Sequence, residues 1–290
     1  MLQLASKDLS EAASTRLTRL QSRIDDVSTF AQKAKKSTSL WDNKSTSRIG
    51  ATAFNEVRDT LSEMCVSVKI CNYCEQNEAN DIEHIYPKSL FPDQTFVWSN
   101  YLLACKQCNT AYKLDSFAVL DPNDDLIPVP RGTEPPNQHG AFINPRKENP
   151  ANFLILNLGS FKFDLMPGLS KVDSHKADKT IEVLQLNERD TLIEAREAAA
   201  KYYYHRMELL SRILQAVTTN EIDAILTPHD PDVEDTLSLV ELKAQLTASF
   251  KNDIQKCQHP SVWHSIKVVA SKTSEKWARL FHEIPDALNW

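Results

Sequence analysis

Two pairs of cysteines give the strongest chemical signal in the sequence. They are the ends of two short motifs, Cys71-Asn-Tyr-Cys74 and Cys105-Lys-Gln-Cys108. A Cys-x-x-Cys turn presents two thiolates together, and two such turns supply the four ligands of a closed tetrahedral zinc site. The alternative is four unrelated buried thiols, which is improbable for two such motifs in a chain of six cysteines. We therefore predict one structural Zn²⁺ held by Cys71, Cys74, Cys105 and Cys108.

The segment that these motifs enclose carries side chains suited to acid–base chemistry. Together with the residue after the second motif, it supplies a carboxylate, an imidazole and two amides: Glu83, His84, Asn100 and Asn109. Adjacent residues of a strand point to opposite faces, so Glu83 and His84 can converge only where a strand bends or ends. Pro87 indicates such an end. A lone histidine is more often structural, but these companions favour a catalytic one.

These residues resemble the HNH endonuclease family, whose core is a two-stranded hairpin and a helix, the ββα-metal unit. The family's His-Asn-Asn series falls on His84, Asn100 and Asn109. The resemblance implies that His84 deprotonates water, that Glu83 and Asn109 bind catalytic Mg²⁺ or Mn²⁺, and that Asn100 holds the His84 loop. This chain has Glu83 where the family more often has aspartate. Lys113 follows Asn109 one residue later than in the family's Asn-x-x-Lys.

Further segments resemble the HNH subunit of Septu and retron-associated antiphage systems, the PtuB-like proteins. The matching segments are 71–75, 81–84, 87–89, 98–102, 104–109, 144–146, 149–150 and 180–187. The resemblance covers about residues 50–195 and implies an antiphage effector with an ABC- or SMC-like (PtuA-like) ATPase partner. In the retron branch it also implies a reverse transcriptase–RNA assembly. The chain has no Gly-x-x-x-x-Gly-Lys motif, so ATP binding by that route falls to the partner.

Two other functions remain open beside a DNA endonuclease. One is an HNH ribonuclease that cleaves structured RNA or tRNA, because a site that reads phosphate geometry and not the 2′-hydroxyl serves both nucleic acids. The other is a zinc-stabilised module that binds nucleic acid or protein without cutting. Glu83-His84 together with Asn109 favours a nuclease, since a module that only binds structural zinc needs none of these residues.

The charge of the chain limits how it can bind nucleic acid. Lys and Arg total 33 of 290 residues against 39 Asp and Glu, a net charge of −6. This excludes a histone-like protein that binds by bulk charge. Residues 66–115 contain four lysines and six acids, a net charge of −2. We therefore expect the chain to cut poorly alone and to depend on a partner or on flanking basic loops for its substrate.

Candidate phosphate contacts are few. Four lie in or near the proposed core: Lys88, Lys113, Arg146 and Lys147. Five more form a run before it: Lys33, Lys35, Lys36, Lys44 and Arg48. Such a run is more often a solvated face than a phosphate-binding patch. The other histidines lack companions at metal-ligand spacing, and we expect them at the surface or in packing: His139, His175, His229, His259, His264 and His282.

Periodicity indicates the elements that position these groups. Apolar residues recur at helical spacing from Leu9 to Ala31, and again from Phe54 to Met64. A Ser/Thr/Lys-rich break, Lys35–Ser47, separates the two stripes. Seven of the fourteen prolines lie in Asp121–Pro150, which indicates an extended connection. No apolar run approaches the roughly 20 residues of a membrane span and no signal peptide is evident, so we expect a cytoplasmic protein.

The expected fold class is α+β. A ββα-metal core with its four-cysteine zinc site lies between mainly α-helical segments. We predict four parts, which are a helical segment (1–65), the HNH core with the zinc motifs (66–120), a proline-rich extended and hairpin extension (121–175) and a helical domain (176–290).

Overall fold

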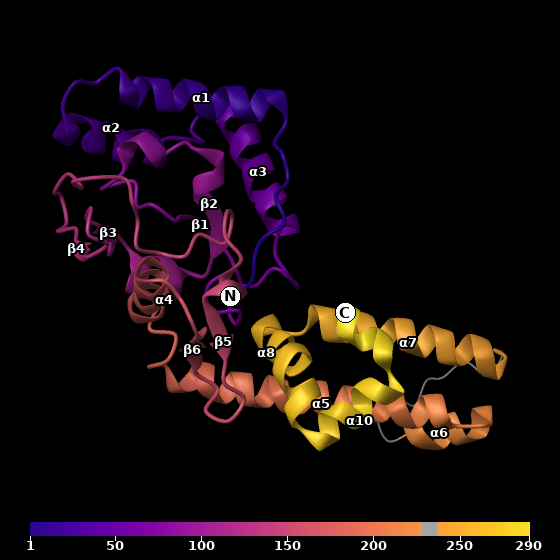
Figure 1. Ribbon diagram of the computed structural model, residues 1–290. Helices are drawn as coiled ribbons and strands as arrows, with labels where there is room; N and C mark the ends of the chain where they lie inside the picture. The colour runs from indigo at the N-terminus through magenta and orange to yellow at the C-terminus, as the bar shows by residue number, and fades with distance from the viewer. Residues whose placement is uncertain (228–236) are drawn as a thin grey trace. The chain divides into compact units, whose positions relative to one another are not determined.

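The structure is a computed structural model that describes residues 1–227 and 237–290 (Figure 1). His229, which we expected at the surface or in packing, lies outside the described residues. The described chain divides into two units, of which the first comprises residues 1–156 and 162–192 and the second residues 157–161 and 193–290. Helices combine with three two-stranded antiparallel sheets, which confirms the α+β class. Within the described residues, no helix is long and apolar enough to cross a membrane.

Three helices precede the cysteine-rich region: α1 (Glu11–Asp25), α2 (Phe30–Asp42) and α3 (Arg48–Glu63). Each begins after a hydroxyl side chain, of Ser10, Thr29 or Ser47, that accepts a hydrogen bond from the first turn. The break predicted over residues 35–47 was wrong in its first half. The cap at Thr29 begins helix α2, which continues through residues 35–42 of the predicted break. The buried face of this helix carries Ser37 and Leu40.

Residues 81–113 form the expected hairpin and helix. Strands β1 (Asp81–His84) and β2 (Tyr101–Ala104) pair antiparallel, with Glu83 opposite Leu102 and His84 opposite Tyr101. The helix that follows, η3 (Gln107–Lys113), is a π-helix. In it the Leu114 amide donates to the Asn109 carbonyl over 2.8 Å, five residues back. This wider turn accommodates the extra residue between Asn109 and Lys113.

The rest of the first unit consists of two hairpins, short 3₁₀ turns and one helix. Strands β5 (Leu154–Leu156) and β6 (Phe163–Leu165) pair as the sequence indicates, and α4 (Lys171–Leu184) contacts β6. The remaining elements are η1 (Pro92–Gln94), η2 (Trp98–Asn100), β3 (Ala118–Leu120), β4 (Leu126–Pro128) and η4 (Pro150–Asn152).

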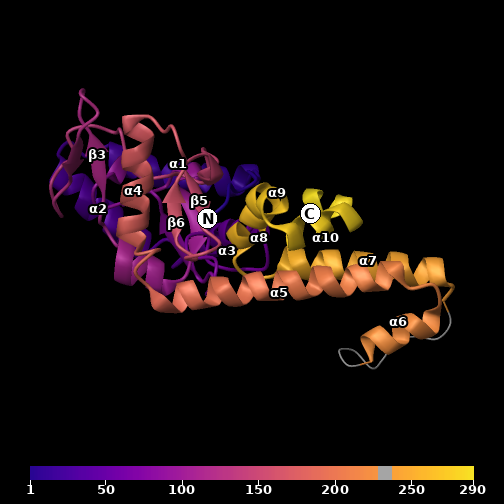
Figure 2. The same cartoon turned by 60° about the horizontal axis from the view of Figure 1, so that its bottom comes forward.

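The second unit is helical. Its longest helix, α5 (Asp190–Gln215), begins in the first unit, and α7 (Leu239–Lys256) lies beside it (Figure 2). Arg206 joins the two, because its guanidinium pairs with Asp253 and lies 4.3 Å over the Phe250 ring. The other helices are α6 (Thr219–Leu226), α8 (Pro260–Ser265), η5 (Ile266–Ala270), α9 (Ser271–Thr273), α10 (Glu275–Glu283) and η6 (Pro285–Asn289).

Candidate functional site

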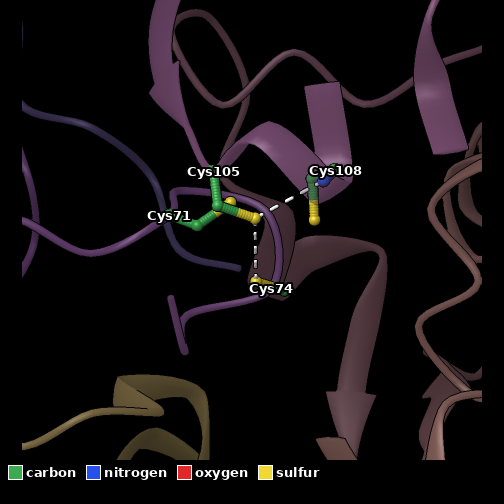
Figure 3. A group of neighbouring side chains, drawn as sticks. All are labelled: Cys71, Cys74, Cys105 and Cys108. Carbon is green, nitrogen blue, oxygen red and sulfur yellow. Dashed lines mark hydrogen bonds between the residues drawn. The ribbon is translucent and has the colours of Figure 1, made fainter. Parts of the chain in front are cut away.

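The four motif cysteines meet in the first unit (Figure 3). All four are buried, and their Sγ atoms lie within 4.8 Å of one another. The Cys74 and Cys105 sulfurs are 3.9 Å apart. Zn–S bonds of about 2.3 Å in a tetrahedron place sulfurs about 3.8 Å apart, so this cluster fits the predicted zinc ion.

Arg189 contacts this cluster, and the sequence analysis missed it. Its Nη1 donates to the Cys108 Sγ over 3.4 Å and its Nη2 donates to the Gln107 side-chain oxygen. The guanidinium lies 4.7 Å from the centre of the Tyr112 ring and is 7% exposed. Four thiolates and Zn²⁺ leave a net charge of about −2, which this buried cation partly offsets. The one sequence signal for Arg189 was its position just after segment 180–187, which resembles the PtuB-like proteins.

The surroundings of His84 set its tautomer. Its Nε2 lies 3.0 Å from the Thr95 carbonyl oxygen. A carbonyl can only accept, so Nε2 carries the hydrogen and the neutral ring keeps its lone pair on Nδ1. Burial, followed by the charge of Lys88, lowers the pKa of His84 well below its ordinary value. The neutral ring is therefore the stable form.

Two aromatic rings hold the imidazole in place. Trp41 of α2 lies 4.2 Å from it and Tyr101 of β2 lies 5.1 Å from it, both edge-to-face. The Tyr101 hydroxyl also donates to the Thr95 carbonyl, over 2.5 Å. Neither aromatic residue was among the predicted site residues, because each is brought to His84 by the fold and not by a motif.

One cleft of about 270 Å³ collects the proposed catalytic groups. Glu83, His84 and Asn109 all line it, with Trp41 and Lys88 on its walls. The structure therefore brings together three of the four residues that the sequence analysis selected. Their convergence follows from the strand end at His84 and from the helix that starts behind β2.

Asn100 lies behind this cleft and makes three hydrogen bonds to backbone. Its Oδ1 accepts from the Tyr86 amide over 2.8 Å, and its Nδ2 donates to the carbonyls of Tyr86 and Gln94, both over 3.0 Å. The side chain thus ties the loop after His84 to the segment that carries Thr95. The positioning role of Asn100 stays a prediction, and these hydrogen bonds are the contacts through which it would act.

Lys113 does not face solvent, so its predicted phosphate contact was wrong. Its side chain is fully buried, and its Nζ lies 2.7 Å from the Glu83 Oε1 and donates to the His84 carbonyl over 2.8 Å. Burial raises the pKa of Glu83 and the Lys113 charge opposes that rise. Asn109 directs its Nδ2 to the Asp81 carboxylate over 3.1 Å, so its amide oxygen is the atom available to a cation.

Arg146 is also internal, and its predicted phosphate contact was wrong for the same reason. It is 9% exposed, donates to the carbonyls of Tyr101 over 2.6 Å and Trp98 over 3.2 Å, and stacks 4.6 Å over the Trp98 ring. Burial lowers its pKa to about 10. Lys147 is exposed and Lys88 is partly exposed in the cleft, so both remain predictions.

Comparisons with known proteins agree with this geometry. Residues 71–113 match the model of the HNH endonuclease family, "HNH endonuclease". The "Septu protein PtuB" of Bacillus thuringiensis is 27% identical over 131 residues, which are 43% of this chain and 40% of that protein. The chain thus spans well under half the length of this curated relative. No solved structure matches the chain significantly.

Proposed function

We propose that this chain, whose residues 71–113 match the HNH endonuclease family, is a metal-dependent endonuclease that hydrolyses nucleic-acid phosphodiesters, with DNA as the expected substrate. The observation that carries the proposal is the state of His84. Its Nε2 hydrogen is engaged by the Thr95 carbonyl, and Nδ1 keeps a lone pair in a cleft that Glu83 and Asn109 also line. A structural histidine does not require this combination.

The residues of the cleft divide the reaction between them. His84 Nδ1 accepts a proton from the attacking water, and the Thr95 carbonyl stabilises the imidazolium that forms. Asn100 fixes the loop that carries these groups, so the ring meets the water in one orientation. The edge-to-face contacts of Trp41 and Tyr101 restrict rotation of the ring.

The carboxylate of Glu83 and the amide oxygen of Asn109 are the hard oxygen donors that Mg²⁺ or Mn²⁺ prefers. When bound, such a cation neutralises the charge that develops on the phosphate and the leaving oxygen. The Lys113 ammonium forms an ion pair with the Glu83 carboxylate, so this carboxylate is not an isolated buried charge. The chain's own contribution is therefore two oxygen ligands, which suits an ion that keeps several waters.

The similarity to PtuB supports a role as an antiphage effector. A PtuA-like ATPase as the partner fits the absence of a Walker-type motif from the sequence. The comparisons give no support to the predicted retron reverse transcriptase and RNA. The acidic core, with its net charge of −2 over residues 66–115, supports our expectation that a partner assists substrate capture.

The test compares His84→Ala with His139→Ala, the same change at an exposed loop histidine. Purified chains with equal zinc content are incubated with supercoiled DNA or total RNA, with and without Mg²⁺ or Mn²⁺. We expect metal-dependent DNA cleavage by wild type and His139→Ala, and a loss of about 10²–10⁴-fold in His84→Ala. Equal cleavage by His84→Ala contradicts the proposal. Cleavage of RNA alone would favour the ribonuclease.

A further inference from the structure

The cleft beside His84 carries charged side chains of both signs, although the net charge of the chain is −6. Of the acids that line it, Glu83 pairs with Lys113 and Asp115 pairs with Arg131, and Asp42 lines it as well. Lys88 lines the cleft directly. Lys44 lies behind Trp41, with its Nζ 4.3 Å from the centre of the Trp41 ring, and that ring lies 4.2 Å from His84.

Arg58 of α3 extends this positive region. Its Nη1 donates to the Asn80 carbonyl over 2.5 Å, directly before β1 begins. Burial lowers the pKa of Lys44, and the charges of Arg58 and Lys88 lower it further, whereas Asp42 opposes the change. We call Lys44, Arg58 and Lys88 the cationic wall. It combines Lys44 from the turn between α2 and α3 and Arg58 from α3 with Lys88 from the segment after β1.

The cationic wall is only partly neutralised, by the charge of Asp42 near Lys44. Among the described residues, none of the three side chains forms an ion pair, whereas Lys113 pairs with Glu83 and Arg131 pairs with Asp115. The Lys44 ammonium donates only to the Trp41 carbonyl, over 3.2 Å, and otherwise faces aromatic rings. Like charges held together repel, so an anion bound between them is stabilised.

We propose that the cationic wall binds the phosphate backbone of the nucleic acid next to the bond that is cut. This inference rests on the proposed function and deepens it, because it assigns substrate capture to Lys44 and Arg58, outside the matched residues 71–113, together with Lys88 inside them. The acidic core can then act on a substrate that it would not attract. Contacts to phosphate carry no base information, so this part of the binding is independent of sequence.

The test measures binding of a labelled DNA duplex to the full chain between 50 and 200 mM salt in magnesium-free buffer. Lys44→Met and Lys88→Met remove charge but keep an apolar stem that can cover the Trp41 ring. Lys251→Met, at an exposed position of α7, is the matched control. Zinc content and circular dichroism verify that every variant is folded.

Each phosphate contact that is lost should lower the slope of log affinity against log salt by about one. Affinity at 50 mM salt should fall about 10-fold for each of the two wall variants and stay unchanged for Lys251→Met. Unchanged affinity and slope in both wall variants, with wild-type cleavage intact, overturn the inference and leave the nuclease standing. In that case an acidic protein surface becomes the better occupant. A wild-type chain that neither binds nor cuts overturns both.

Discussion

The Lys113 ammonium lies 2.7 Å from the Glu83 carboxylate, and both side chains are buried. The same ammonium donates to the His84 carbonyl over 2.8 Å, so one lysine fastens the π-helix η3 to two successive residues of β1. This lysine therefore acts inside the ββα unit and not on a substrate. Its position depends on the wide helical turn that ends at Lys113.

Lys113→Met should destabilise the first unit, because it leaves Glu83 as an unpaired buried carboxylate. Breaking a buried pair by removal of one partner costs about 3–5 kcal/mol. The double variant Lys113→Met/Glu83→Leu removes both charges and should recover most of that loss. Urea unfolding followed by circular dichroism compares the three chains. A single variant as stable as wild type would show that the pair is unimportant for stability.

Asn100→Ala should lower the turnover number without weakening substrate binding. The side chain makes three backbone hydrogen bonds around Tyr86 and Gln94 and contacts the reaction only through the loop that it holds. Removal of such a supporting group costs about 10–100-fold in activity. Steady-state cleavage gives kcat and KM separately, and Asn220→Ala, exposed on α6, is the control. A change confined to KM would argue that Asn100 touches substrate instead.

Zinc content should be one ion per chain, and it should depend on the four clustered cysteines. Cys105→Ser is expected to lose the ion and to melt at a lower temperature, since metal binding contributes folding free energy. Cys257→Ser, at a cysteine outside the cluster, should retain zinc. Elemental analysis of folded samples decides, and a zinc-free wild type that unfolds normally would rule out a structural ion.

Arg189→Ala should release zinc to a chelator about 10–100-fold faster than wild type, because a charge-assisted contact to the Cys108 sulfur is lost. Arg189→Lys should lie between the two, since a lysine keeps the charge but cannot reproduce the planar fork that also reaches Gln107. Arg212→Ala, exposed near the end of α5, is the control. Identical release from all four chains would mean that Arg189 does not support the ion.

The spacing of residues within short motifs predicted those features that depend on a few consecutive residues. Two Cys-x-x-Cys turns identified the sulfur cluster, and Pro87 indicated the strand end that lets Glu83 and His84 reach one cleft. The hairpin of β5 and β6 lies within the extended and hairpin extension that the sequence predicted over residues 121–175. Each of these signals lies in a short segment, although the two cysteine motifs meet only because the fold brings residues 71–74 and 105–108 together.

Features that depend on distant segments were not predicted. Trp41 reaches His84 from a helix in a stretch that the sequence analysis treated partly as a break. The Thr95 carbonyl is a backbone group, which has no residue signature. Lys113 and Arg146 look like surface cations in a sequence, and only the fold shows that carboxylate and carbonyl oxygens bind them internally.

The chain passes between its two units three times, because the tip of the β5–β6 hairpin, residues 157–161, belongs to the second unit. That tip is secured there when Arg196 of α5 donates to the Phe161 carbonyl over 2.9 Å. No single cleavage of the backbone can therefore separate the two units. A truncation at residue 192 would leave the hairpin loop without Arg196, so a shorter chain that keeps the first unit requires a redesign of that loop as well.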